Sequence, residues 1–395
     1  MPQTRPIGLA TMIFSAVSLC ACTHGGTPNT TGETAALPAD AAIEHLLAAN
    51  GVRGLAVALI EDGEVASVDV YGMRDRERDL PLTRQTVVSG LSWTKFVFSA
   101  YVAELAAEGR IDLDRPIAEY LARPLPEYDG YGDLAGDERW RALTLRYLLS
   151  HQSGFPNFRF FPPNSDYDPE APLAFFQGPG MSYAYSGEGF QIAQLVISEA
   201  LDIDIAADLE HRFFAALGTD DIGLTWRESF TDDYDAGHNP DGSRIGHPVR
   251  EEFDAAGSIN GSPTAFARFV SAFMRGELVS DAARTELLAP QTPVRSAHQF
   301  PPWSAERDET LAAIDLSAGL GVVLWTGPQG RGFFKGGHDD GADNMLVCLI
   351  ERNDCILMMT NIAKGHLIFP QIAEAVLGPT GLPWTWEYSQ LDESD

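Results

Sequence analysis

Residues 40–109 show two kinds of apolar spacing, one helical and one with the twofold repeat of a strand. Asp40 can cap a helix, Asp62-Gly63 has the composition of a hairpin turn, and Gly109 would end an apolar stretch that is long enough for a buried helix. The predicted elements are a helix over 41–49, antiparallel strands over 54–61 and 64–71, and a buried helix over 93–108.

The last third of the chain changes to short apolar stretches separated by turn residues. Strands are expected over 319–325, 332–335, 344–351 and 355–360, and a closing helix over 370–377. Helical spacing covers 191–201 and, after the capping pair Ser262-Pro263, 264–274. Strands at both ends and helices between them predict an α/β plus all-α fold. We expect a discontinuous antiparallel-sheet α/β domain (38–91 and 310–385), an inserted, mainly helical domain with active-site loops (92–309), and a functional groove between the two.

The N-terminus has the features of an export signal. Residues 7–21 are apolar or small and uncharged, which is too short for a comfortable membrane span. Leu19-Cys20-Ala21-Cys22 resembles a lipobox, so we expect a signal peptide over 1–21, a lipidated Cys22, and a flexible tether over 22–37 that is rich in Gly, Thr and Pro. The predicted location is a bacterial membrane, as a lipoprotein that faces the periplasm or cell exterior. The alternative is an ordinary cleaved secretory signal.

The charge of the chain excludes one class of partner, and its cysteines leave one disulfide open. The formal net charge of −29 excludes nucleic acid as a partner and suits a protein in an exposed compartment. Cys348 and Cys355 lie in adjacent apolar runs, which leaves a disulfide between them open.

Lysine is rare in this chain, and one lysine has a serine close by. Only Lys95, Lys335 and Lys364 occur among 27 basic residues. A buried lysine can lose its proton and act as a base, which arginine cannot do. Ser92 lies three residues before Lys95 at the start of the predicted buried helix, so their side chains can converge. The pair is a candidate nucleophile and base, and the simpler alternative is a serine that only caps the helix.

Three motifs in order carry a family resemblance. They are Ser92-x-x-Lys95, Gly109-x-Ile111-x-Leu113-Asp114, and Leu148-Leu149-Ser150-His151-Gln152-Ser153-Gly154. Together they resemble the serine beta-lactamase-related family, which includes class C beta-lactamases, penicillin-binding DD-peptidases and family VIII carboxylesterases. The resemblance covers about residues 43–376 and implies a beta-lactamase/transpeptidase-like fold.

The resemblance also implies further site residues. Tyr185 matches the Tyr of a Tyr-x-Asn motif in which Gly187 replaces the Asn, and it would relay protons, with a pKa that nearby lysines could depress. Lys335-Gly336-Gly337-His338 matches the third motif. There Lys335 would hold Tyr185 or bind a carboxylate, and Gly336 lacks the usual Thr hydroxyl.

The backbone N–H groups of Ser92 and His338 would form the oxyanion hole, and Gly337 would keep this strand clear for the substrate. Phe158 stands where class C enzymes have a Gln that touches the acylamino group, which favours an apolar substrate group. His151 is expected in a structural turn rather than as a base. Glu188 could pair with a lysine, but a role at a helix terminus is favoured.

These observations predict a serine acyl hydrolase that uses Ser92, Lys95 and Tyr185. An esterase for small apolar acyl esters fits best. A DD-peptidase or beta-lactamase is the first alternative, and a catalytically weak, lipid-anchored binding protein is the second. We expect a small ester or amide substrate, a lipid bilayer as partner through the N-terminal anchor, and neither cofactor nor metal.

Overall fold

The computed structural model describes residues 37–162, 167–246 and 249–388. The predicted signal peptide, Cys22 and nearly all of the predicted tether lie outside the described residues. Within the ranges that are described, no helix combines the length and apolar character needed to cross a bilayer.

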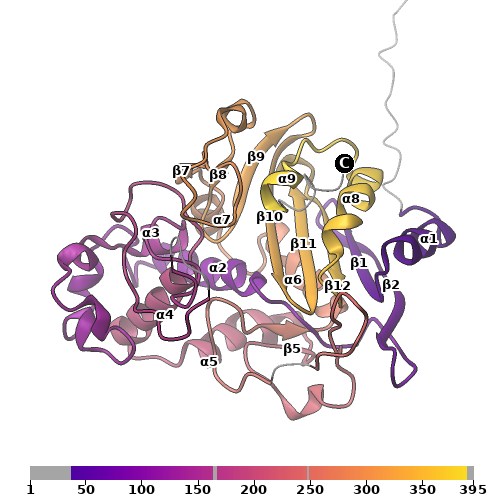
Figure 1. The fold of residues 1–395 in the computed structure, drawn as a ribbon, viewed down its shortest axis with the longest axis horizontal. Helices are drawn as coiled ribbons and strands as arrows, with labels where there is room; N and C mark the ends of the chain where they lie inside the picture. The colour runs from indigo at the N-terminus through magenta and orange to yellow at the C-terminus, as the bar shows by residue number, and fades with distance from the viewer. Residues whose placement is uncertain (1–36, 163–166, 247–248, 389–395) are drawn as a thin grey trace, which may run out of the picture. The chain divides into compact units, whose positions relative to one another are not determined.

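A nine-stranded antiparallel sheet forms the centre of the fold (Figure 1). The strands follow the order β3-β2-β1-β12-β11-β10-β9-β8-β7. Their bounds are β1 (Gly54–Glu61), β2 (Glu64–Asp75), β3 (Leu80–Pro81), β7 (Thr292–Pro293), β8 (Ser317–Ala318), β9 (Val323–Gly327), β10 (Gly330–Asp339), β11 (Ala342–Leu349) and β12 (Asp354–Thr360). Because β1 pairs with β12, strands from the two ends of the chain meet inside one sheet. The predicted discontinuous antiparallel sheet is confirmed.

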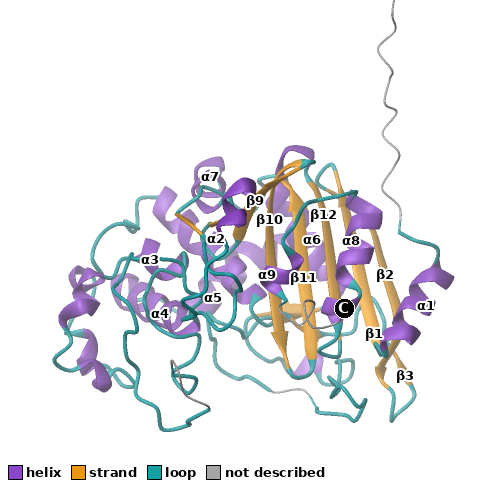
Figure 2. Cartoon of the chain, turned by 45° about the horizontal axis from the view of Figure 1, so that its top comes forward, coloured by secondary structure: helices purple, strands orange, loops and turns teal. Residues whose placement is uncertain are grey.

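Helices cover both faces of this sheet (Figure 2). On one face pack α1 (Asp40–Asn50), α8 (Phe369–Leu377) and α9 (Trp384–Glu387), and on the other α2 (Trp93–Ala107) and α6 (Pro263–Met274). Side chains of a strand alternate between the two faces, so a strand that is covered on both must be apolar throughout. In β1 the odd positions Leu55, Val57 and Leu59 join one core, and the even positions Ala56, Ala58 and Ile60 join the other. This explains the continuous apolar run at 54–61.

The helical part surrounds α2, which is buried along nearly its whole length. Its other elements are α3 (Leu145–Leu149), α4 (Gly187–Leu201), α5 (Ile205–Leu209), α7 (Asp281–Leu287) and a small sheet of β4 (Val88–Ser89), β5 (Ile222–Gly223) and β6 (Asn260–Gly261). The helix predicted from residue 191 begins at Gly187, because the Ser186 hydroxyl caps it by accepting a hydrogen bond from the N–H of Gly189 (3.0 Å). One core contains residues of both the sheet and the helical part, and the division into two domains at the expected boundaries stays a prediction.

The structure also answers the question about the cysteines. Cys348 and Cys355 lie directly opposite each other on β11 and β12, with Cα atoms 4.1 Å apart, and form a disulfide.

Candidate active site

Ser92 stands at the N-terminal end of α2, directly after a strained residue. Leu91 has a φ of 50°, a left-handed conformation that costs a residue with a side chain about 1–3 kcal/mol. The turn is held by Thr94, whose hydroxyl donates to the Leu91 carbonyl at 2.7 Å. The Ser92 side chain makes no capping hydrogen bond with the helix. Its hydroxyl is therefore available to the cleft, which argues against the simpler capping role.

Lys95 lies one turn along α2 and is buried, with 1% of its surface exposed. Its Nζ is 3.2 Å from Ser92 Oγ and donates to the backbone carbonyl of Ala256 at 2.6 Å. Burial lowers the pKa of Lys95 well below its ordinary value, and the positive charge of Lys335 lowers it further. A neutral amine beside a serine hydroxyl can accept its proton, so the predicted convergence of the two side chains places a base next to a nucleophile.

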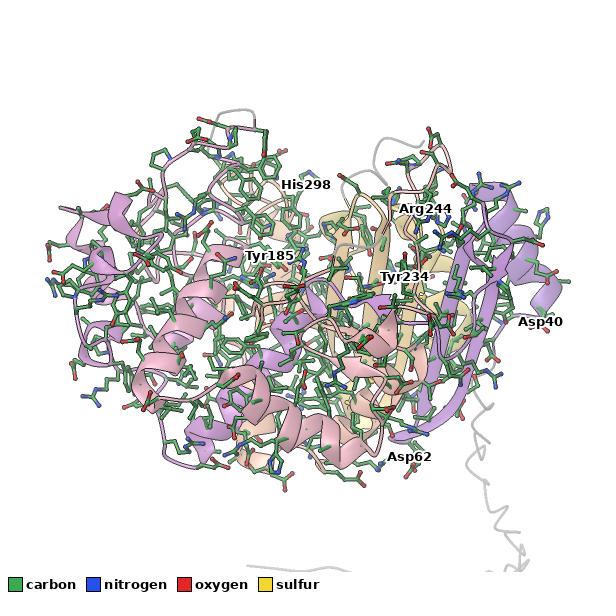
Figure 3. All side chains as sticks on the ribbon, turned by 90° about the horizontal axis from the view of Figure 1, so that it is seen from below. Asp40, Asp62, Tyr185, Tyr234, Arg244 and His298 are labelled. Carbon is green, nitrogen blue, oxygen red and sulfur yellow. A yellow bond between two sulfur atoms is a disulfide. The ribbon has the colours of Figure 1, made fainter. Side chains whose placement is uncertain are left out.

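Tyr185, which is labelled in Figure 3, lines the same cleft as Ser92. Its hydroxyl accepts a hydrogen bond from Lys335 Nζ at 3.2 Å, and the same lysine contacts the carbonyl of Gly336. Burial raises the pKa of Tyr185, a hydrogen bond with Ser92 lowers it, and the charge of Glu387 raises it again, with a net upward shift. The sequence allowed for a depressed pKa, and the structure gives the opposite direction. Tyr185 is therefore a neutral phenol that can donate a proton.

His151 belongs to the turn that supports Tyr185. The two rings stack with centroids 4.3 Å apart. The Nδ1 of His151 accepts the N–H of Ser186 at 3.1 Å, and its backbone carbonyl accepts the N–H of Ala184 at 2.7 Å. Burial, followed by the charges of the two site lysines, lowers its pKa well below the ordinary value. The side chain is thus a neutral support in a turn, which is the role favoured by the sequence.

Strand β10 lies against the start of α2. The indole N–H of Trp93 donates to the carbonyl of Lys335 at 3.1 Å. A Cβ at Gly337 would lie 3.1 Å from the backbone nitrogen of Ser92, so the strand approaches that nitrogen closely only because residue 337 has no side chain. Ser92 and His338 line the same cleft, and the oxyanion hole made by their N–H groups stays a prediction.

The cleft has a volume of about 670 Å³ and a wall that is rich in aromatic side chains. It contains Ser92, Tyr185, Lys335, Gly336 and His338, so the structure brings these predicted residues together. The aromatic residues of the wall are Phe158, Phe161, Tyr167, Phe300 and Trp303. Phe158, predicted to contact an apolar group, stacks on Phe160 with centroids 5.1 Å apart.

Gly187, which stands at the Asn position of the second motif, has an amide beside it. A Cβ at Gly187 would lie 2.7 Å from the carbonyl oxygen of Asn157 and 3.0 Å from its Oδ1. The N–H of Gly187 donates to that Oδ1 at 3.1 Å, and Asn157 lines the cleft. Gly187 lacks the side-chain amide of the motif, but the side-chain amide of Asn157, from another segment, lies beside it. Sequence spacing could not reveal this contact.

Glu387 is a cleft residue that sequence reasoning missed. It ends α9, is 5% exposed, and accepts a hydrogen bond from the side-chain amide of Gln299. Burial raises the pKa of its carboxyl to about 7, while the charge of Lys335 opposes this shift. The available signal was Gly336, since a glycine in a strand often marks a close approach by another group.

Glu188 does not pair with a lysine. It lies in the first turn of α4, where its carboxylate binds Arg159 at 2.8 Å and accepts the Arg159 backbone N–H at 2.9 Å. It therefore holds the aromatic wall segment to the helix terminus. Among the described residues, no cluster of three or more His, Cys, Asp or Glu side chains suits a metal ion, and the absence of a cofactor stays a prediction.

The chain is similar to known proteins of one family. The model of the Beta-lactamase family matches residues 39–377. The curated protein Esterase EstB of Burkholderia gladioli is 24% identical over 212 residues, which cover 48% of this chain and 51% of that protein. The chain spans about half the length, or less, of the curated relatives it matches.

Solved structures share the fold at low sequence identity. A penicillin-binding protein homologue from Pyrococcus abyssi, described as octameric, has a TM-score of 0.68 and 17% identity, and covers 89% of this chain and 80% of its own. D-alanine carboxypeptidase AmpC from Burkholderia cenocepacia has a TM-score of 0.66 and 18% identity, and covers 85% of this chain and 96% of its own. The predicted fold class is confirmed.

Proposed function

We propose that this chain, which belongs to the beta-lactamase family of serine hydrolases, hydrolyses small esters with an apolar acyl group through an acyl-enzyme on Ser92. One observation carries the proposal. A buried Lys95 amine with a lowered pKa lies 3.2 Å from a Ser92 hydroxyl that does not cap its helix.

In the proposed reaction, Ser92 Oγ attacks the ester carbonyl carbon while its proton passes to Lys95 Nζ. The N–H groups of Ser92 and His338 stabilise the oxyanion. The C–O bond to the alcohol breaks, and the departing oxygen takes a proton from Tyr185, whose phenol is restored by the proton on Lys95. In the second half of the reaction the protons move along the reverse path. Water loses a proton as it attacks the acyl carbon, and Ser92 Oγ takes up a proton as the acid is released.

The choice of an ester with an apolar acyl group rests on the cleft wall. Phe158 and the other aromatic side chains offer apolar contacts and no amide-binding group at that position. Gly336 lacks the hydroxyl that would bind a carboxylate. Each missing hydrogen bond to a polar group of a substrate costs about 1–3 kcal/mol, which disfavours beta-lactams and peptides. Asn157 places a side-chain amide in the cleft lining, so a DD-peptidase or beta-lactamase is kept as the alternative.

A comparison of two substrates tests the proposal. We expect measurable hydrolysis of p-nitrophenyl butyrate, only trace turnover of nitrocefin, and loss of both in Ser92→Ala. A higher kcat/KM for nitrocefin than for butyrate would replace the esterase assignment with the lactamase one. If neither substrate is turned over, the chain is better described as a binding protein that keeps the fold. We also propose that the protein is exported and anchored through Cys22, on the strength of the lipobox.

A further inference from the structure

The carboxylate of Glu387 occupies space that a side chain at position 336 would need. A Cβ added to Gly336 would lie 2.0 Å from Glu387 Oε1 and 3.1 Å from its Cδ. The hydrogen bond from Gln299 holds the other oxygen, Oε2. Lys335 and Glu387 line the same cleft, so the carboxylate shares the cleft with this cation.

This placement changes what Lys335 can bind. Glu387 is the charged group that most favours the protonated form of Lys335, and Lys335 is the charged group that most favours the ionised form of Glu387. Because burial raises the pKa of Glu387 to about 7, the carboxyl is mostly charged only above that pH, and there its charge compensates that of Lys335. A substrate carboxylate that approached Lys335 would also approach the carboxylate of Glu387, which would repel it.

The other cation of the cleft lining, Arg250, also has a carboxylate close to it. Arg250 lies 3.6 Å from the carboxylate of Asp254, and both residues line the cleft. Among the described residues of the cleft lining, the lysine and the arginine each have a carboxylate that acts on their charge, Glu387 for Lys335 and Asp254 for Arg250. No lysine or arginine among these described lining residues offers an uncompensated positive charge to an anion.

We infer that Glu387 determines specificity, and that it makes the cleft accept uncharged esters and reject esters whose acyl group carries a carboxylate. The inference rests on the proposed esterase function and names its substrate class. For two like charges about 5 Å apart at an effective dielectric constant of about 20, the repulsion corresponds to a discrimination on the order of 100-fold in kcat/KM.

The test compares p-nitrophenyl butyrate with mono-p-nitrophenyl succinate, which carries a carboxylate on an acyl chain of similar length. The measured quantity is the ratio of kcat/KM for the neutral ester to that for the anionic ester, so any loss common to both substrates cancels. We expect the wild type to prefer butyrate by about 100-fold. Glu387→Gln keeps an oxygen that can accept from Gln299, and it should reduce this preference at least tenfold.

Asp339→Asn is the matched control. Asp339 lines the same cleft but is exposed to solvent, so loss of its charge should change the ratio less than threefold. An equal shift in both variants would overturn the assignment to Glu387, as would a ratio in Glu387→Gln within twofold of the wild type. Should that variant fail to fold, Glu387→Ala is measured in its place and judged by the same limits on the ratio. Failure of the proposed function looks different, because neither ester would then be hydrolysed or hydrolysis would survive Ser92→Ala.

Discussion

The contact between Gly336 and Glu387 allows a quantitative prediction about stability. In Gly336→Ala, the new Cβ would start 2.0 Å from Glu387 Oε1, more than 1 Å inside an ordinary contact of about 3.5 Å. Met345 Cε, at 3.4 Å from the same Cβ, leaves little room on the other side. Relief requires the buried carboxylate, which accepts a hydrogen bond from Gln299, to shift. We expect a loss of about 1–3 kcal/mol in the free energy of unfolding, the usual cost of overpacking.

A double-mutant cycle isolates this contact. In the Glu387→Ala background the obstruction is gone, so Gly336→Ala should cost less than about 0.5 kcal/mol, and the coupling energy should be about 1–3 kcal/mol. Gly257→Ala is the matched control, because a Cβ at Gly257 would have its nearest neighbour, Arg250, at 3.8 Å. Urea unfolding followed by tryptophan fluorescence measures all five proteins. A coupling energy near zero, or equal effects of the two glycine substitutions, would refute the placement of Glu387 over Gly336.

Three further predictions concern the base, its titration and the anchor. Lys95→Arg should retain less than a tenth of kcat/KM on p-nitrophenyl butyrate, a loss of more than about 1.4 kcal/mol, because arginine stays protonated. Lys364→Arg is the matched control and should retain full activity. The pH–rate profile should stay active well below pH 10.5 and fall only as acid protonates Lys95, because burial lowers the pKa of that amine; activity confined to pH values above 10.5 would contradict this. Cys22→Ser should move the protein from the membrane to a soluble fraction, and a wild type that is already soluble would refute the lipid anchor.

Local spacing was enough to predict the features that depend on neighbours in the chain. The apolar run at 54–61 predicted the strand β1, and the three-residue separation of Ser92 and Lys95 predicted that their side chains meet on α2. Both features depend only on the regular repeat of a strand or a helix, so they can be read from the spacing of residues in the sequence.

The features that depend on distant packing could not be predicted in this way. Glu387 reaches the cleft from the last described helix, and no spacing relates it to Lys335. The expected depression of the Tyr185 pKa was wrong for the same reason. Burial outweighs the effect of the lysines: Lys95 is itself poorly charged, and the charge of Lys335 is opposed by Glu387.

The central claim is that Ser92 is a nucleophile activated by the lysine beside it. Incubation of the protein with a fluorophosphonate, followed by intact-mass measurement and peptide mapping, tests this most directly. We predict a single adduct on Ser92 in the wild type and none in Ser92→Ala. An unlabelled wild type, or an adduct that persists in Ser92→Ala, would contradict the account.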